Sequence, residues 1–251
     1  MMILIDSLLS QITDGAICDI RVGASWTAVE AHVAGERRCG LATSFSGHRS
    51  GHHGRPRVAD AGNLTGFSPT ALVQLARSDS PMEIAIGLAA INALLPRQPA
   101  LWAEEHAADV IAHHGKGKRV VLVGHFPFVD QLRERVGTLW VLELQPQAGD
   151  LPASAAVDVV PRADVLAITS TAFINRTFAG LMALRRRDAL VMLLGPSTPL
   201  SPVLFDYGVH FLSGAIVQDV DRVLQAVSQG ANFRQVRRSG VQLVTMSQIV
   251  P

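Results

Sequence analysis

The first part of the chain carries short segments in which hydrophobic and polar residues alternate. The alternation spans residues 16–22 and 26–33, a third short segment follows at 38–45, and glycine-containing turns separate them. Alternation with a period of two is typical of strands with one buried face. The pattern predicts a three-stranded antiparallel meander, preceded by an amphipathic helix at residues 5–12.

Two helices are predicted to follow the meander. Ser68-Pro69 and Ser80-Pro81 each place a capping serine before a proline, a combination found where helices begin. Glu83 stands three residues after Ser80 and completes a predicted capping box. The run at 84–95 is apolar nearly all round, so this second helix is expected to be buried.

Five continuous apolar runs dominate the rest of the chain. They lie at residues 120–123, 139–142, 165–168, 189–194 and 209–212. Helices are predicted at residues 102–113, 129–136, 153–160, 172–185 and 220–227. Continuous apolar strands that alternate with helices indicate a parallel sheet covered on both faces. The sequence thus predicts an α/β protein with an α+β domain at 1–98 and a Rossmann-like, doubly wound domain at 99–251.

Composition and charge exclude several classes of protein. Of the 251 residues, 48% are hydrophobic and 17% are charged, which excludes a disordered protein. The 22 Lys and Arg nearly balance the 21 Asp and Glu, and a net charge of +1 provides no field to attract nucleic acid. The longest apolar run has 12 residues, fewer than the roughly 20 that span a bilayer, and the N-terminus lacks a signal-peptide pattern. We therefore expect a cytoplasmic protein with neither a nucleic-acid nor a membrane partner.

Candidate ligand-binding residues follow the predicted strands of the second domain. In open parallel sheets, ligands bind beyond the carboxyl ends of the strands. The residues at these ends are Gly124, His125 and Phe126, then Glu143, then Ser170, Thr171 and Asn175, and finally Gly195, Ser197 and Thr198. His125 is a candidate acid, base or metal ligand, because an imidazole serves each of these roles near neutral pH.

Each of these candidates also has a structural explanation. Glu143 follows Gly124 by 19 residues, where nucleotide-binding folds often place a ribose acceptor, but an acid at a strand end needs no function. Ser170 and Thr171 suit an anion at a helix N-terminus and would equally serve as helix caps. Asn175, predicted one turn inside a helix, would face a ligand or a neighbouring domain. His125 and Asn175 are the candidate catalytic residues.

Familiar catalytic and nucleotide-binding motifs are missing from the sequence. Gly124 stands alone where a dinucleotide fingerprint needs three glycines, and there is no P-loop or G-x-S-x-G motif. Two clusters of histidines lack the spacing of a known metal motif; they are His48, His52 and His53, and His106 and His113 with Asp109. Cys18 and Cys39 are expected to be buried free thiols. The cofactor is therefore left open, with a transition metal ion as the candidate because imidazole suits such ions.

Several segments together resemble one known family. They lie at residues 19–23, 25–29, 83–95, 124–127, 149–150, 161–165, 169–177 and 195–200. In this order they resemble the bacterial and archaeal DUF364 family, which carries an N-terminal DUF4213 domain. The proteins of this family are described as heavy-metal chelation proteins. The resemblance covers nearly the whole chain.

The resemblance implies a fold and a site. It implies an N-terminal domain like that of enolase, a Rossmann-like C-terminal domain, and a site in the cleft between them, with Trp26 and Thr27 closing the side opposite the strand ends. Our leading hypothesis is that this cleft binds a small anionic or chelating molecule or a metal chelate. The alternative is an enzyme that acts on a nucleoside-type or pterin-like molecule with His125 as acid or base. A protein with an empty cleft, and a homodimer, are further options that the sequence leaves open.

Overall fold

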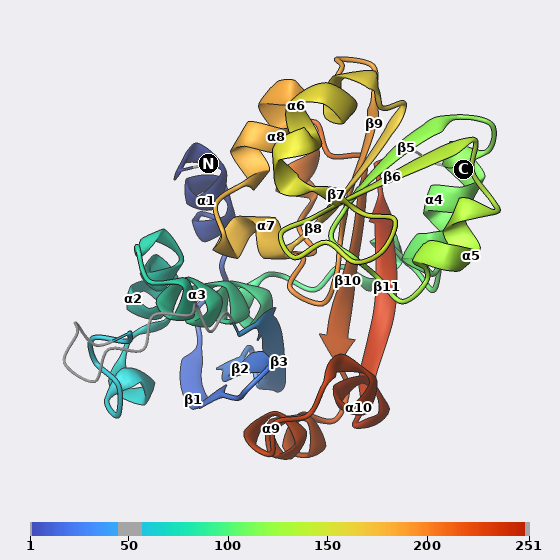
Figure 1. The fold of residues 1–251 in the computed structure, drawn as a ribbon. Helices are drawn as coiled ribbons and strands as arrows, with labels where there is room; N and C mark the ends of the chain where they lie inside the picture. Colours follow the sequence, from blue (N-terminus) through green and yellow to red (C-terminus); the bar gives the residue numbers. More distant parts are fainter. Residues whose placement is uncertain (1, 45–56, 249–251) are drawn as a thin grey trace.

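Two sheets organise the chain, as Figure 1 shows. The structure is a computed structural model that describes residues 2–44 and 57–248. One sheet has three antiparallel strands, and the other has eight strands that are mostly parallel. This confirms the predicted α/β fold class with a Rossmann-like sheet. The division between residues 98 and 99 stays a prediction.

The small sheet is the predicted meander. Its strands β1 (Ala16–Val22), β2 (Trp26–Val33) and β3 (Glu36–Thr43) lie in the order β1-β2-β3, and α1 (Met2–Leu9) precedes them. Turn residues Ala34 and Gly35, both with positive φ, join β2 to β3 and let β3 begin two residues earlier than the sequence predicts.

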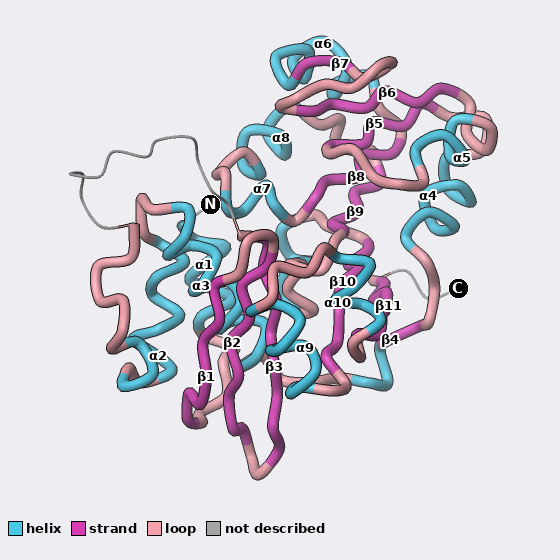
Figure 2. The backbone as a smooth tube through the Cα atoms, turned by 60° about the horizontal axis from the view of Figure 1, so that its bottom comes forward, coloured by secondary structure: helices cyan, strands magenta, loops and turns pink. Residues whose placement is uncertain are grey.

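Helices cover both faces of the small sheet. The helix α2 (Pro69–Val73) leads to α3 (Pro81–Leu94), whose apolar side chains are almost all buried and which packs against β2 and β3. On the opposite face, α9 (Val220–Ser228) and α10 (Phe233–Arg238) share a hydrophobic cluster with side chains of β2 and β3. Figure 2 shows α9 alongside this sheet. The C-terminal segment of the chain thus returns to bury the N-terminal sheet.

The predicted capping box at α3 does not form. The Ser80 side chain makes no capping hydrogen bond and donates to the Arg57 carbonyl oxygen instead. The Glu83 carboxylate accepts from the Ser78 hydroxyl and, at 2.8 Å, from the Ala59 amide. These contacts with the preceding segment compete for the side chains that a capping box would use.

The large sheet supplies the surface on which a site can form. Its strands are β4 (Trp102–Ala103), β5 (Arg119–Val123), β6 (Thr138–Glu143), β7 (Leu151–Pro152), β8 (Val165–Thr169), β9 (Leu190–Leu194), β10 (Phe211–Val217) and β11 (Val241–Ser247). They lie in the order β4-β11-β10-β9-β8-β5-β6-β7, in which β11 and β4 are antiparallel to their neighbours. The chain begins the parallel core at β5, adds β6 on one side, and then adds β8, β9 and β10 on the other. The order of strands therefore reverses between β5 and β8.

Short helices connect the strands of the large sheet. They are α4 (Ala107–Gly115), α5 (Val129–Arg133), α6 (Ala156–Val159), α7 (Thr171–Ile174) and α8 (Phe178–Leu184). Two predicted helices are corrected. The one expected at 102–113 begins only at Ala107, because Trp102 and Ala103 pair with β11. The one expected at 172–185 is broken at Arg176, whose φ of 61° is incompatible with a continuing helix.

Candidate functional site

A cavity of about 510 Å³ lies at the carboxyl ends of β5, β6 and β8. We call it the strand-end pocket, and all of its lining residues come from positions 123–184. It lies where the order of the parallel strands reverses, which is the place where open α/β sheets bind ligands. Apolar side chains form most of its wall, and a few polar groups converge on it: His125, Glu143, Thr169, Thr171, Asn175, Arg176 and Thr177.

His125 is held in the pocket by a buried carboxylate. Its Nδ1 lies 2.8 Å from Oδ2 of Asp150, whose side chain is 0% exposed, whereas the His125 side chain is 25% exposed. The same oxygen accepts a hydrogen bond from the Gln147 amide at 3.0 Å. A carboxylate in this position is an acceptor, so Nδ1 carries the proton and donates it. The lone pair of Nε2 is then free for a ligand.

The other oxygen of Asp150 is short of partners. Its Oδ1 atom is buried and finds no hydrogen-bond donor within the described part of the chain; Nη2 of Arg133 lies 3.9 Å away. A buried carboxylate is costly unless its charge is compensated. A metal ion bound at Nε2 of His125 would bring positive charge to the side chain that Asp150 contacts.

Gly124 gives the backbone its turn into the pocket. Its φ is +100°, which a residue with a side chain rarely adopts. A Cβ atom at this position would lie 3.1 Å from Cβ of Thr169 and 3.3 Å from a ring carbon of Phe126. Glycine thus adopts this conformation without strain, and its lack of a side chain avoids tight contacts between the ends of β5 and β8.

Glu143 is already engaged in joining two strand ends. Its Oε2 accepts from the His125 amide at 2.9 Å, and its Oε1 accepts from the Leu144 amide at 2.6 Å. These bonds support the structural explanation of Glu143. Each oxygen retains a second lone pair, so a ligand hydroxyl could still donate to it.

Asn175 ends α7, which corrects its predicted place inside a helix. Its Oδ1 accepts from the hydroxyl of Thr177 at 2.7 Å and from the Thr177 amide at 3.2 Å. The next residue, Arg176, reaches out of the pocket to the carbonyl oxygens of Arg77 and Ser78 and pairs with Asp79 at 2.8 Å. The rim of the strand-end pocket is thereby tied to the N-terminal half of the chain.

The structure brings together half of the predicted site residues. Those that line the pocket are Gly124, His125, Phe126, Glu143, Thr171 and Asn175. Ser170 and Gly195 lie directly behind this wall, where Ser170 donates its amide to Leu194 and a Cβ on Gly195 would meet the Ser170 hydroxyl at 3.0 Å.

The other four predicted residues lie elsewhere. Ser197 is fully buried and its Oγ accepts from the Thr43 amide at 2.9 Å, while Thr198 lines a separate cavity of about 20 Å³. Trp26 packs on Phe233 at 5.2 Å between ring centroids, and the hydroxyl of Thr27 lies 2.9 Å from that of Ser44. A ligand-binding role for these four stays a prediction without support from their position.

Neither predicted histidine cluster provides a set of metal ligands within the described part of the chain. Within residues 2–44 and 57–248, close donor atoms occur at Cys18, Glu30 and His32, not at His106, Asp109 and His113. His106 instead caps α4 and Asp109 pairs with Arg135 at 2.8 Å. His48, His52 and His53 lie outside the described residues.

The sequence did not identify Asp150, which holds His125, or the lining residue Arg176 as a site residue. Asp150 belongs to the polar segment that follows β6, and Arg176 follows Asn175 directly. The resemblance included both segments, but only the folded chain shows that Asp150 reaches His125, 25 positions earlier.

The fold and the pocket define a class of protein: an α/β protein whose Rossmann-like sheet presents a ligand-sized pocket at its topological switch point. Residues 106–246 match the DUF364 family and residues 5–95 match DUF4213, both described as "Putative heavy-metal chelation". The chain belongs to the DUF364 family.

Relatives with solved structures share the whole fold. A DUF364 protein of unknown function from Desulfitobacterium hafniense is 27% identical, with a TM-score of 0.84 over 99% of both chains. A second, from Pyrococcus horikoshii, is 18% identical, with a TM-score of 0.79 over 97% of this chain and 98% of that one. The uncharacterized protein MJ0500 of Methanocaldococcus jannaschii is 24% identical over 84% of this chain and 82% of its own length.

None of the helices in the described part of the chain combines the length and the apolar character needed to cross a bilayer.

Proposed function

We propose that the strand-end pocket binds a small chelating molecule or its metal complex, and that Nε2 of His125 contacts the metal or the polar group of that molecule. The contact between His125 and Asp150 carries this proposal. Metal-binding histidines commonly donate their other ring nitrogen to a carboxylate, which fixes the ring and makes it a better ligand. The family description, which refers to heavy-metal chelation, supports the same choice.

The pocket suits a chelate better than a bare ion. One imidazole is too few ligands for a stable metal site, which needs three or four. A chelating molecule supplies the remaining ligands itself, and a cavity of about 510 Å³ has room for it. The threonine hydroxyls and the Asn175 amide can then bind its carboxylates.

The proposal is tested with a defined chelate, the nickel complex of iminodiacetate, which leaves coordination positions open for a protein ligand. Isothermal titration is expected to show one equivalent bound by the native chain. His125→Gln should weaken this binding at least about tenfold, and Asp150→Asn by about ten- to a hundredfold. His113→Gln, an exposed histidine on α4, is the matched control. If His125→Gln binds the nickel complex with the same affinity as the native chain, the proposal is contradicted.

The same contact supports an enzymatic alternative. A histidine oriented by a buried carboxylate is also the arrangement of a general base. If the protein is an enzyme for a nucleoside-type or pterin-like molecule, His125→Gln should retain the ligand that co-purifies with the native chain but fail to convert it. Native mass spectrometry on protein purified without chelator or histidine tag distinguishes the two, because the chelate proposal predicts loss of that ligand.

A further inference from the structure

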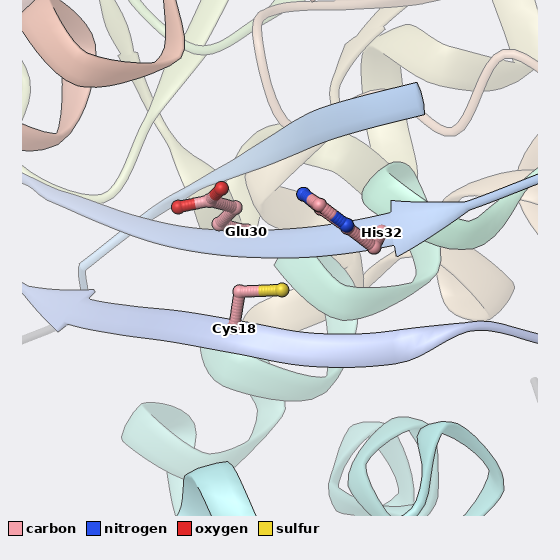
Figure 3. A group of neighbouring side chains, drawn as sticks. All are labelled: Cys18, Glu30 and His32. Atoms are coloured by element: carbon pink, nitrogen blue, oxygen red, sulfur yellow. The ribbon is translucent and has the colours of Figure 1, made fainter. Parts of the chain in front are cut away.

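Three metal-ligating side chains meet on the small sheet, far from the strand-end pocket along the chain. Cys18 comes from β1, and Glu30 and His32 come from the neighbouring strand β2, as Figure 3 shows. The thiol sulfur, a carboxylate oxygen and a ring nitrogen all lie within 4.8 Å of one another. This is the group that the described residues offer for a metal ion.

A β-bulge places the cysteine next to the other two. Glu30 and His32 are two positions apart on a strand and therefore share a face. Ile17 pairs with Ala31, but Asp19 pairs with Glu30, so Cys18 is an extra residue in β1. Such a residue turns its side chain away from the regular alternation of the strand. Cys18 is exposed, contrary to the sequence prediction that both thiols are buried, whereas Cys39 is buried as predicted.

The three groups differ in burial in a way that suits an ion entering from solvent. Cys18 and His32 are exposed, whereas Glu30 is 6% exposed. Oε1 of Glu30 accepts from Nε of Arg37 at 2.7 Å, and Arg37 continues to Asp221 on α9 at 2.7 Å. Arg37 thus fixes the buried carboxylate by one oxygen, and Oε2 can serve as the ligand atom.

The second cysteine provides an internal contrast. Cys39 lies on β3 in the cluster with α9, and its burial raises the pKa of the thiol to about 12. The thiolate, not the thiol, binds metals. Cys39 therefore stays protonated near neutral pH, and Cys18 is the cysteine that an ion from solvent can reach.

We propose that Cys18, Glu30 and His32 form a binding site for a thiophilic divalent cation of the zinc class. Thiolate, imidazole and carboxylate are the ligands of zinc, and a thiolate disfavours calcium and magnesium. Three protein ligands leave a fourth position for water or for a small chelating molecule. As the metal–sulfur bond forms, the Cys18 thiol releases its proton to solvent, so affinity rises with pH.

The geometry needs only a small adjustment. Donor atoms around tetrahedral zinc lie about 3.5 Å apart, given bond lengths of about 2.0–2.3 Å. Rotation of the exposed Cys18 and His32 side chains can close the remaining distance, because few neighbours restrict them. The site does not depend on the proposed function of the strand-end pocket.

Cobalt titration of the full chain under reducing, oxygen-free conditions tests this site, because cobalt takes zinc sites and gives an absorption band when a thiolate binds it. The native chain should show this band with one equivalent of Co²⁺, and Zn²⁺ should abolish it by displacement. Cys18→Ser should remove the band, and His32→Gln should weaken binding at least about tenfold. Both residues are exposed, so circular dichroism should show an unchanged fold.

Two control variants separate this site from other histidines. His125→Gln should leave the cobalt band unchanged even if it abolishes binding of the nickel chelate, so either proposal can fail alone. The triple variant His48→Gln, His52→Gln and His53→Gln should also retain the band. No thiolate band in the native chain, or a band that persists in Cys18→Ser, would overturn the proposed site.

Discussion

At the scale of single residues, Gly124 determines whether β5 can turn into the strand-end pocket. Its φ of +100° disfavours a residue with a side chain, and a Cβ would make tight contacts of 3.1–3.3 Å with Thr169 and Phe126. Gly180, on α8, lines the same pocket, but a Cβ there would meet open space. The two glycines therefore form a matched pair for mutation.

We predict that Gly124→Ala lowers the free energy of unfolding by about 1–2 kcal/mol, the cost of a left-handed conformation in a residue with a side chain. Gly180→Ala should leave it unchanged or raise it by up to about 1 kcal/mol, because alanine favours helix. Urea denaturation measures both. Equal stability of the two variants would show that Gly124 does not constrain the pocket.

Sequence reasoning reached only part of the site at this scale. His125 could be predicted because it directly follows an apolar strand, and strand ends converge in an open sheet. Asp150 could not, since its role depends on an approach to His125 that no local pattern encodes. The same limit applies to Cys18, whose place beside Glu30 and His32 depends on how β1 pairs with β2.

At the scale of elements, Asp164 fixes the start of the strands that carry the pocket. Its carboxylate accepts from the amide and the guanidinium of Arg119 at 2.9–3.0 Å and from Arg186 at 2.9 Å. Asp164 precedes β8 and Arg119 begins β5, so these bonds align the two strands at the end opposite the pocket. The hydrogen bonds from Arg119, and then its charge and that of Arg186, hold the pKa of Asp164 well below its usual range.

Because the pKa of Asp164 is lowered in the folded chain, its contribution to the free energy of unfolding depends on pH. The contribution of Asp164 is complete above its unfolded pKa of about 3.9 and is lost as pH falls through the lower folded value. Asp164→Asn should therefore cost about 1 kcal/mol near pH 7, allowing for solvent screening, and progressively less below about pH 4. Urea titrations over this range measure the difference. Asp188→Asn, which removes only an exposed partner of Arg186, is the control. A difference that does not shrink in acid would contradict this role.

The elements themselves were predictable where burial alone determines them. The apolar runs at β5, β6, β8, β9 and β10 are strands buried on both faces, so their hydrophobicity identifies them. The antiparallel strand β11 was missed because its sequence mixes polar and apolar residues without a regular period. The break between α7 and α8 depends on contacts of Arg176 with residues about a hundred positions away, which no local pattern could show.

At the scale of the whole molecule, Ser197 joins the two halves of the chain. It is fully buried, accepts from the Thr43 amide at the end of β3, and offers its carbonyl oxygen to the side chain of Asn92 on α3. Asn92 also donates to Leu41 of β3. The loop that follows β9 is thus bonded to strand β3 and to helix α3, which packs against the small sheet.

Ser197→Ala should therefore lower the free energy of unfolding of the chain, and its effect should not be confined to ligand binding. It leaves the amide of the half-buried Thr43 without its partner, which costs up to about 1–3 kcal/mol. Ser154→Ala, at an exposed position, should change stability by no more than about 0.5 kcal/mol. Thermal and urea unfolding measure both variants. If Ser197→Ala is as stable as the native chain, the serine has another role, and the predicted ligand contact becomes the better explanation.

If the strand-end pocket binds a chelate through His125, the metal of that chelate must lie next to the His125 side chain. Diffraction from crystals soaked in the nickel complex of iminodiacetate, recorded at the nickel absorption edge, tests it most directly. We expect an anomalous peak within coordination distance of Nε2 of His125, with the chelate inside the pocket formed by β5, β6 and β8. A peak found only at other histidines, with an unoccupied pocket, would contradict it.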